Sequence, residues 1–346
     1  MTHSKRWIIQ SPLTAQASAE LAHLAPPLRQ ILFNRGISTR QDAEYFLRAQ
    51  LTFDDDPFLM KDMHKAVERI QRAIETGEQI GIYGDYDVDG VTSTALLVQA
   101  LRALGGNARE YIPNRFDEGY GLNTDALDTL KNEGVSLVIS VDCGIRSPAE
   151  ADHAKTIGLD LIISDHHEPS GEIPQALAVI NPKQPGDEYP EKYLAGVGIA
   201  YKIAQALHQT LSGLDTRGEN AHATRPSINL QPSNLQLSTL LDLVALGTVA
   251  DLAPLTGENR HLVRGGLRQM RNSARQGLLS LAAVSDISLA KVTAINIGFG
   301  LGPRLNASGR LDSALASYKL LTTTDLFEAG QLAQQLNVQN GQRQQL

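Results

Sequence analysis

The sequence predicts an α/β protein in which a parallel β-sheet is flanked by helices, with a helical region before it and a mostly helical part after it. Short, continuously apolar segments alternate with segments whose apolar residues recur at helical spacing. That alternation is typical of a parallel sheet covered on both faces. Charged clusters follow the apolar segments, and in such sheets ligands bind beyond the carboxyl ends of the strands.

Residues 1–60 are expected to form a helical region of their own. The stretches "TAQASAELAHLAPPLRQILFNRG" and "STRQDAEYFLRAQL" carry apolar residues at helical spacing. Ser38 or Thr39 is the expected N-cap of the second helix, because a hydroxyl there can accept from a free backbone N–H.

Residues 61–325 are expected to form the main domain. Strand-like apolar segments lie at 80–85, 135–142, 159–167 and 176–183, and helix-like segments at 60–79, 90–106, 122–134 and 147–158. Further helices are predicted at 196–211, 235–255, 259–277 and 326–346. Residues from about 211 to 234 are rich in polar residues, glycine and proline, which predicts a surface insertion.

Composition narrows the class of protein. Hydrophobic residues make up 42% and charged residues 20% of the chain, as in ordinary globular proteins. The single cysteine, Cys143, cannot form an intrachain disulfide, and no apolar stretch reaches the roughly 18 residues of a membrane span. We therefore expect a cytoplasmic monomer with no membrane partner. A net charge of −7 argues against a protein that coats nucleic acid, but it leaves room for a local basic groove.

Three aspartates, Asp85, Asp87 and Asp89, follow the first predicted strand in "YGDYDVDG". A single aspartate after a strand is more often a turn former or a helix cap. Three that alternate over five positions repel one another unless cations neutralise them, and divalent cations prefer oxygen ligands. The stretch also resembles the opening of a calcium loop, but the downstream glutamate of that motif is missing.

Further candidates follow the other predicted strands and the helix at 235–255. Asp142 ends the second strand, Asp165, His166 and His167 end the third, and Asp251 ends the helix. Imidazoles beside carboxylates form a mixed nitrogen and oxygen site that suits Mn²⁺, Zn²⁺ or iron. Each residue alone is readily understood as a cap or a surface residue. One shared metal site accounts for all of them together better than several unrelated caps.

The stretches "YGDYDVDG", "VDCG", "SDHHEP" and "ALGTVADLAPL" resemble, in this order, the four motifs of the DHH phosphoesterase superfamily. Two more, "RFDEGYGLN" and "GFGLGPRLNASGRL", resemble the RecJ-type single-strand-specific exonucleases within it. The resemblance runs from about residue 25 to the end. It implies that residues 61–325 are a DHH catalytic domain and that 326–346 begin a helix leading to a second domain. No "GGGH"-like segment of that second domain is present, so we expect either a fragment or a short catalytic core.

The resemblance implies a site for two divalent cations, Mn²⁺ or Mg²⁺, whose ligands also carry the catalysis. The implied ligands are Asp87, Asp89, Asp142, His166, His167 and Asp251. Asp142 is the implied bridging ligand, and Asp85 and Asp165 are expected to orient ligands or water from outside. Several superfamily members have a histidine where this chain has Tyr83, so the first metal is expected to have fewer protein ligands. Two cations about 3.5–4 Å apart can stabilise both the attacking and the leaving oxygen of a phosphodiester.

Two groups of arginines are candidates for contact with a nucleic acid backbone. Arg304 and Arg310 lie in "GPRLNASGR", a predicted glycine-rich loop, where Asn306 and Ser308 are expected to assist in binding phosphate. The helix at 259–277 offers a second stripe near one helical face, although a solvated surface accounts for it equally well. That stripe consists of Arg260, Arg264, Arg268, Arg271 and Arg275.

By resemblance, the expected function is hydrolysis of single-stranded DNA from the 5′ end, in DNA repair and recombination, with a helicase and a single-strand-binding protein as possible partners. A second hypothesis keeps the chemistry but takes short oligonucleotides, cyclic dinucleotides or pyrophosphate as substrate. "GYGLN" and "GPRLNASGR" argue against it. A third is a non-catalytic scaffold, which the presence of all six metal-ligand candidates disfavours.

Overall fold

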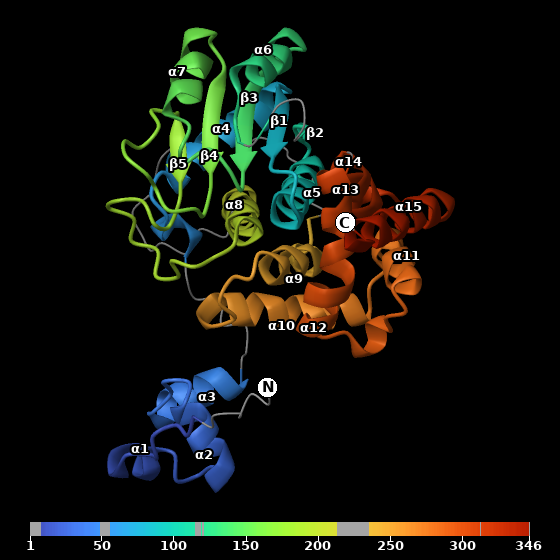
Figure 1. Ribbon diagram of the computed structural model, residues 1–346. Coiled ribbons are helices and arrows are strands. Elements are labelled where there is room, and N and C mark those ends of the chain that lie inside the picture. Colours follow the sequence, from blue (N-terminus) through green and yellow to red (C-terminus); the bar gives the residue numbers. More distant parts are fainter. Residues whose placement is uncertain are drawn as a thin grey trace, which may run out of the picture. The chain divides into compact units, whose positions relative to one another are not determined.

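The computed structural model describes residues 8–48, 56–114, 119, 121–212, 235–311 and 313–345, and it divides into the units Met1–Thr52 and Phe53–Leu346 (Figure 1). Residues 213–234 of the predicted insertion lie outside the described residues, as does most of the 115–120 stretch of "RFDEGYGLN". No described helix has the length and apolar character needed to cross a membrane.

The first unit contains three short helices around a small apolar core. They are α1 (Ala15–Glu20), α2 (Pro26–Phe33) and α3 (Arg40–Arg48). Leu21, Leu32 and Ala43 are buried at the centre. The Thr39 hydroxyl accepts a hydrogen bond from the backbone N–H of Asp42 at 3.1 Å, so Thr39 rather than Ser38 caps α3.

The second unit is built on a five-stranded, fully parallel sheet of order β2-β1-β3-β4-β5. The strands are β1 (Gln79–Gly84), β2 (Asn107–Tyr111), β3 (Val135–Val141), β4 (Asp160–Ser164) and β5 (Ala178–Ile180). The predicted fold class is confirmed, and β1, β3, β4 and β5 match the four predicted strands. The sequence reading missed β2, because "NAREY" is polar and lies at the sheet edge, where only one neighbouring strand covers it.

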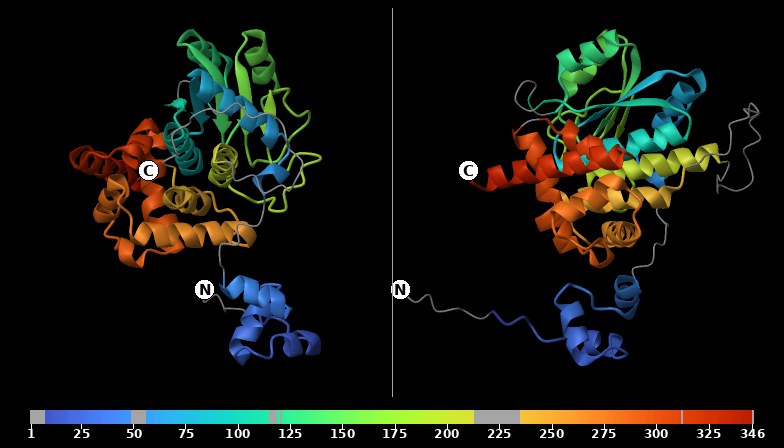
Figure 2. Two further views of the ribbon diagram at one scale, coloured as in Figure 1. Left: turned by 180° about the vertical axis from the view of Figure 1, so that it is seen from behind. Right: turned by 90° about the vertical axis from the view of Figure 1, so that its right-hand side faces the viewer.

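Helices cover both faces of the sheet (Figures 1 and 2). One face carries α4 (Met63–Thr76), preceded by the 3₁₀ turn η1 (Pro57–Leu59), and with it α5 (Val88–Ala103) and α8 (Gly196–Leu211). The other face carries α6 (Thr124–Asn132) and α7 (Pro148–Thr156), which pack on a buried apolar cluster under β3 and β4. The strands are apolar throughout because both of their faces are buried.

A helical layer follows α8 and packs against α5 and α8 (Figure 2). Its elements are η2 (Leu237–Leu240), α9 (Leu241–Ala250), α10 (Gly257–Arg271), α11 (Gln276–Val284), η3 (Leu289–Lys291), α12 (Ala294–Asn296), the π-helical turn η4 (Ile297–Leu301), α13 (Gly302–Leu311), α14 (Leu315–Thr322) and α15 (Leu326–Gln345). Almost every residue of α9 is buried, because α5, α8 and α10 surround it. Helix α15 packs on α11, α13 and α14.

Two predictions about this layer were wrong. "GPRLNASGR" is not a loop but helix α13, in which Pro303 stands in the first turn, where a missing N–H costs nothing. The basic helix α10 ends at Arg271, so Arg275 does not continue its stripe. The Arg275 guanidinium instead pairs with the buried Asp242 carboxylate, with N–O distances of 2.8 and 3.1 Å.

Candidate metal centre

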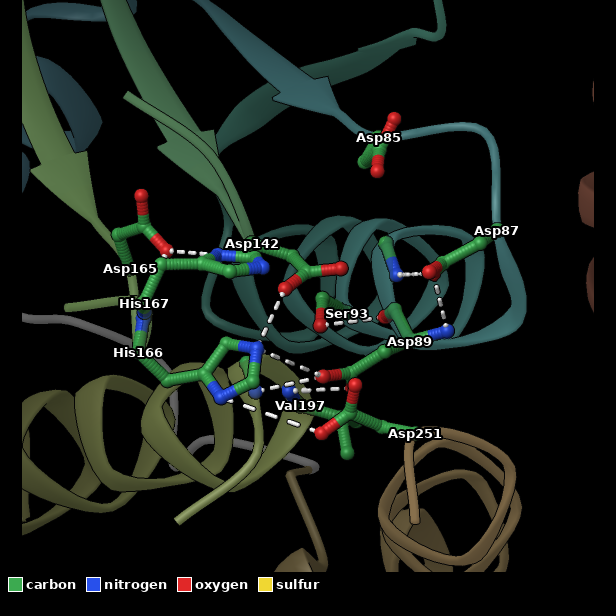
Figure 3. A network of polar contacts seen from close by, with 12 residues as sticks. Asp85, Asp87, Asp89, Ser93, Asp142, Asp165, His166, His167, Val197 and Asp251 are labelled. Carbon is green, nitrogen blue, oxygen red and sulfur yellow. Dashed lines mark hydrogen bonds and ion pairs between the residues drawn. The ribbon is translucent and has the colours of Figure 1, made fainter. Parts of the chain in front are cut away.

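The charged motif residues meet at the carboxyl ends of β1, β3 and β4. From β1 the chain continues to β2 on one side, and from β3 it continues to β4 on the other side. The connections therefore change direction between β1 and β3, which are neighbours in the sheet. Such a switch point leaves a crevice in which ligands bind. Asp85 follows β1, Asp142 follows β3, and Asp165, His166 and His167 follow β4 (Figure 3).

The first loop places two carboxylates at the start of α5. Asp87 is the N-cap of α5, and its Oδ1 accepts from the N–H groups of Asp89 at 2.8 Å and Gly90 at 3.1 Å. Asp89 is buried in the first turn, and its two oxygens accept from the N–H groups of Gly196 at 2.7 Å and Val197 at 2.9 Å. These N–H groups begin α8, so the positive end of that helix faces the Asp89 carboxylate.

Asp142 occupies a strained position between β3 and α8. Its φ of 63° lies in the left-handed region, which residues other than glycine, asparagine and aspartate rarely adopt. Its N–H donates to the carbonyl of Ser164 at 3.0 Å, which continues the β3–β4 ladder beyond the last strand residue. Gly196 packs so closely that a Cβ there would lie 2.8 Å from the Cβ of Asp142.

The His166 imidazole lies among three carboxylates that come from different elements (Figure 3). Its Nε2 is 3.0 Å from Asp142 Oδ1 and 3.8 Å from Asp89 Oδ2, and its Nδ1 is 3.9 Å from Asp251 Oδ2. Burial, followed by the neighbouring His167, lowers the pKa of His166 to about 4. The ring is therefore neutral near pH 7 and has a lone pair to offer a cation.

Asp165 holds His167 in place. Its Oδ1 accepts from the backbone N–H groups of His166 and His167 and contacts His167 Nδ1 at 2.7 Å, while its Oδ2 accepts from the N–H of Ile145. Burial opposes the charge on Asp165, but the hydrogen bonds from His167 and the backbone outweigh it and lower the pKa. The Nδ1 contact directs the other ring nitrogen of His167 away from Asp165, which is the usual arrangement for a metal-binding histidine.

The remaining carboxylates are crowded, and crowding together with burial raises their pKa values. Burial is the largest cause that raises the pKa of the two fully buried carboxyl groups, those of Asp89 and Asp142. The charge of Asp251 raises the pKa of Asp89 further, and the charge of Asp89 raises the pKa of Asp142 further. Burial and the Asp87 charge raise the pKa of Asp85 to about 7 and that of Asp251 to about 6. A cluster of this kind ionises fully only when cations neutralise it.

The donor set fits divalent cations. Among the described residues, three groups of side chains bring their ligand atoms within 4.8 Å of one another: Asp142, His166 and His167; Asp89, His166 and Asp251; Asp85, Asp87 and Asp142. Asp142 Oδ1 and His166 Nε2 are buried and have no hydrogen-bond partner among the residues that the structure describes, although they lie 3.0 Å apart. Two buried atoms that face each other without bonding are explained by a cation that both would contact.

The structure brings together all six predicted metal ligands, and it adds Asp85 to one of the groups. The prediction that Asp85 acts from outside stays untested, and its place in this group makes Asp85 a candidate ligand as well. Tyr83 is fully buried, and its hydroxyl donates to the carbonyl of Gly121 at 2.8 Å, so it has a structural contact. The sequence reading missed the role of Gly196, and the only signal was a glycine at the start of an apolar helix.

The predicted phosphate-binding residues have different surroundings from those expected of a loop. Arg304 donates to Asn337 Oδ1 at 2.9 Å and to the carbonyl of Gly300 at 2.8 Å. Ser308 is fully buried and bonded to Leu305 and Ser317, so it does not reach a surface where phosphate could bind. Asn306 accepts from the N–H of Val88 in the first turn of α5. The backbone of Arg310 belongs to α13, and its side chain lies outside the described residues.

Comparisons with known proteins agree with this geometry. The model of the DHH family, N-terminal domain, matches residues 79–248. The single-stranded-DNA-specific exonuclease RecJ of Bacillus subtilis is 42% identical over 99% of this chain and 40% of its own length. The protein of the same name from Salmonella typhimurium is 40% identical over 96% of this chain and 56% of its own length. The chain thus spans about half the length of the curated relatives it matches.

Solved structures show the same similarity. A crystal structure of exonuclease RecJ bound to manganese is 35% identical, covers 83% of this chain and 67% of that chain, and superposes with a TM-score of 0.70. The structure of RecJ from Thermus thermophilus in complex with Mn²⁺ is 30% identical over 97% of this chain and 45% of that chain, with a TM-score of 0.75.

Proposed function

Because the chain belongs to the DHH family, among the relatives of RecJ, we propose that it is a metal-dependent exonuclease that hydrolyses single-stranded DNA from the 5′ end. The observation that carries the proposal is the set of three adjoining metal-capable groups at the carboxyl ends of β1, β3 and β4. Both the names of the relatives and the Mn²⁺ in their crystal structures support it.

Two Mn²⁺ or Mg²⁺ ions would be held by a set of carboxylates and imidazoles, in which Asp142 belongs to two of the metal-capable groups. That set consists of Asp85, Asp87, Asp89, Asp142, His166, His167 and Asp251. Such ions supply Lewis acidity, which lowers the pKa of water and offsets the charge of a phosphodiester. Asp85 is the addition that the geometry makes to the ligands implied by the motifs.

The protein's own contribution is to fix the donors before substrate arrives. Helix α8 directs two N–H groups at Asp89, and Asp165 holds the ring of His167. The neutral His166 ring contributes no charge that would compete with a cation. Donors that are already oriented do not have to reorganise during the reaction, and that preorganisation is a major source of rate acceleration.

The same proposal places the protein in the cytoplasm, in DNA repair and recombination, acting with a helicase and a single-strand-binding protein. The absence of a membrane-spanning helix among the described residues is compatible with that compartment. Copurification from cell lysate, with and without nuclease treatment to remove bridging DNA, would test the two protein partners.

Product analysis tests the activity. The chain would be incubated with 5′-labelled and 3′-labelled single-stranded DNA, with duplex DNA, and with dinucleotide and pyrophosphate substrates, each with Mn²⁺, Mg²⁺ or EDTA. We expect metal-dependent release of nucleotides from the 5′ end of single strands only. Turnover of only the small substrates would replace the proposal with a dinucleotide or pyrophosphate hydrolase. Metal binding without any turnover would favour a scaffold.

A further inference from the structure

The first turn of α5 carries Asp89, follows directly on Asp87, and has every one of its N–H groups satisfied. A helix begins with N–H groups that have no partner within the helix. Asp87 Oδ1 accepts from Asp89 and Gly90, and the Asp87 carbonyl accepts from Val91. The first N–H, that of Val88, donates to Asn306 Oδ1 at 3.0 Å, from a residue 218 positions away in the chain.

Helix α13 meets the same loop at a second point. A Cβ on Gly309 would lie 2.5 Å from the carbonyl oxygen of Tyr86, so only glycine allows this approach. Within the loop, a Cβ on Gly90 would lie 2.5 Å from the carbonyl oxygen of Asp85. The segment from Asp85 to Gly90 is therefore held between its own strand end and α13.

We propose that Asn306 is a positioning residue for the metal centre: it completes the N-cap of α5 from another helix and so fixes where Asp87 and Asp89 present their carboxylates. The amide oxygen has to face Val88, because a backbone N–H can only donate. This deepens the proposed function, on which it rests, and it replaces the expectation that Asn306 contacts phosphate. Partners that orient metal ligands typically change metal affinity about 10–100-fold when they are removed.

The test compares equilibrium Mn²⁺ binding, measured by electron paramagnetic resonance titration, in four proteins. Asn306→Leu keeps the approximate volume but has no acceptor, and Asn306→Asp keeps the acceptor oxygen. Ser317→Ala is the matched control, since it removes a buried hydroxyl that donates to the Leu305 carbonyl of α13 at 2.8 Å and leaves the bond between Asn306 and Val88 in place. Affinity for single-stranded DNA is measured in EDTA on the same proteins.

We expect Asn306→Leu to bind Mn²⁺ at least about tenfold more weakly, while Asn306→Asp and Ser317→Ala stay within about threefold of the wild type. Mn²⁺ affinity unchanged in Asn306→Leu, or lost equally in Asn306→Asp, would overturn the positioning role. Mn²⁺ binding intact in Asn306→Leu together with a loss of DNA affinity would also overturn it, and would show a phosphate contact instead. If Asn306→Leu does not fold, Asn306→Ser, whose shorter side chain draws the acceptor back from Val88, takes its place.

The failure of the inference and that of the proposed function have different signatures. Mn²⁺ binding that depends on Asn306, in a wild-type chain that hydrolyses no single-stranded DNA, would overturn only the proposed function. Hydrolysis by a wild-type chain whose Mn²⁺ affinity is indifferent to Asn306 would overturn only the positioning role. A wild-type chain that binds no Mn²⁺ would overturn both.

Discussion

Asp142 combines three properties that rarely occur in one residue: a buried carboxylate, a left-handed backbone and a buried oxygen without a hydrogen bond. Strain and unsatisfied polarity of this kind persist where function requires them. Asparagine also tolerates the left-handed region, whereas alanine would add backbone strain. Asp142→Asn is therefore the substitution that removes the charge alone.

Asp142→Asn is expected to reduce metal-dependent DNA hydrolysis more than about 100-fold, because it removes the charge of a carboxylate that belongs to two of the metal-capable groups. The metal-free variant should be at least as stable as the wild type, since one of several crowded negative charges is gone. Nuclease assays and denaturant unfolding in EDTA measure the two effects. Asp152→Asn, at an exposed position of α7, is the control, and wild-type activity in Asp142→Asn would exclude Asp142 as a ligand.

Glycine is needed at position 196 because Asp142 packs closely against it, not because of its backbone angles. Gly196→Ala would bring a Cβ to 2.8 Å from Asp142 Cβ, which we expect to destabilise the fold by about 1–3 kcal/mol and to weaken Mn²⁺ binding. Gly330→Ala on α15 is the matched control, because a Cβ there meets no atom within 4 Å. Urea unfolding measures the free energy of unfolding of both variants. Equal stability would mean that α8 shifts to accommodate the added Cβ without a loss of free energy.

At the scale of elements, an ion-pair network joins α4 to the amino ends of the strands, opposite the metal centre. The Glu78 carboxylate accepts from Ser136 on β3 and from Arg69 on α4, both at 2.6 Å, and Arg69 also pairs with Asp160 on β4. The hydrogen bond from Ser136, with further ones from Arg69 and Thr76, outweighs burial and lowers the pKa of Glu78 to about 2. This network is therefore expected to serve stability rather than chemistry.

The lowered pKa of Glu78 predicts a pH-dependent contribution to stability. The contribution is present above the ordinary carboxyl value of 4.5 and is lost as pH falls toward about 2. Glu78→Gln should lower the free energy of unfolding by about 1–2 kcal/mol at pH 7, and the difference should shrink below pH 4.5. Urea titrations across pH test this, with Glu68→Gln as a surface control. A difference that is constant with pH would assign the effect to packing.

The sequence allowed elements to be predicted where one physical signal dominated. The buried strands β1, β3 and β4 were predicted because short, unbroken apolar runs between helices are typical of strands covered on both faces, and α8 was predicted to the residue. Edge strand β2 was missed because its polar residues face a less buried environment. Helix α13 was mistaken for a loop because glycine usually breaks helices, whereas Gly309 is required here by contact with Tyr86.

At the scale of the whole molecule, motif order predicted which residues come together at the candidate metal centre, but it did not reveal what supports them. Residues more than 100 positions apart form the hydrogen bonds from Gly196 to Asp89 and from Val88 to Asn306. No local pattern encodes such pairs, because they depend on how α8 and α13 pack on α5. Arg275 shows the same limit, since its partner Asp242 is buried in a different helix.

Metal binding is expected to stabilise only one of the two compact units. All the metal-capable groups found among the described residues lie in Phe53–Leu346, whereas Met1–Thr52 has its own small core. Saturating Mn²⁺ at about 100 times its Kd should stabilise the second unit by about 2.7 kcal/mol. Hydrogen exchange should then slow in α5 and α8 and remain unchanged in residues 8–48. Equal protection of both units would contradict a site confined to the second.

The most direct measurement is an anomalous difference map from a crystal grown with Mn²⁺ and recorded near the manganese absorption edge. We predict two peaks at the carboxyl ends of β1, β3 and β4, with Asp142 in contact with both. Peaks elsewhere, or an ordered cluster with no peak at saturating Mn²⁺, would contradict a two-metal centre built from these residues.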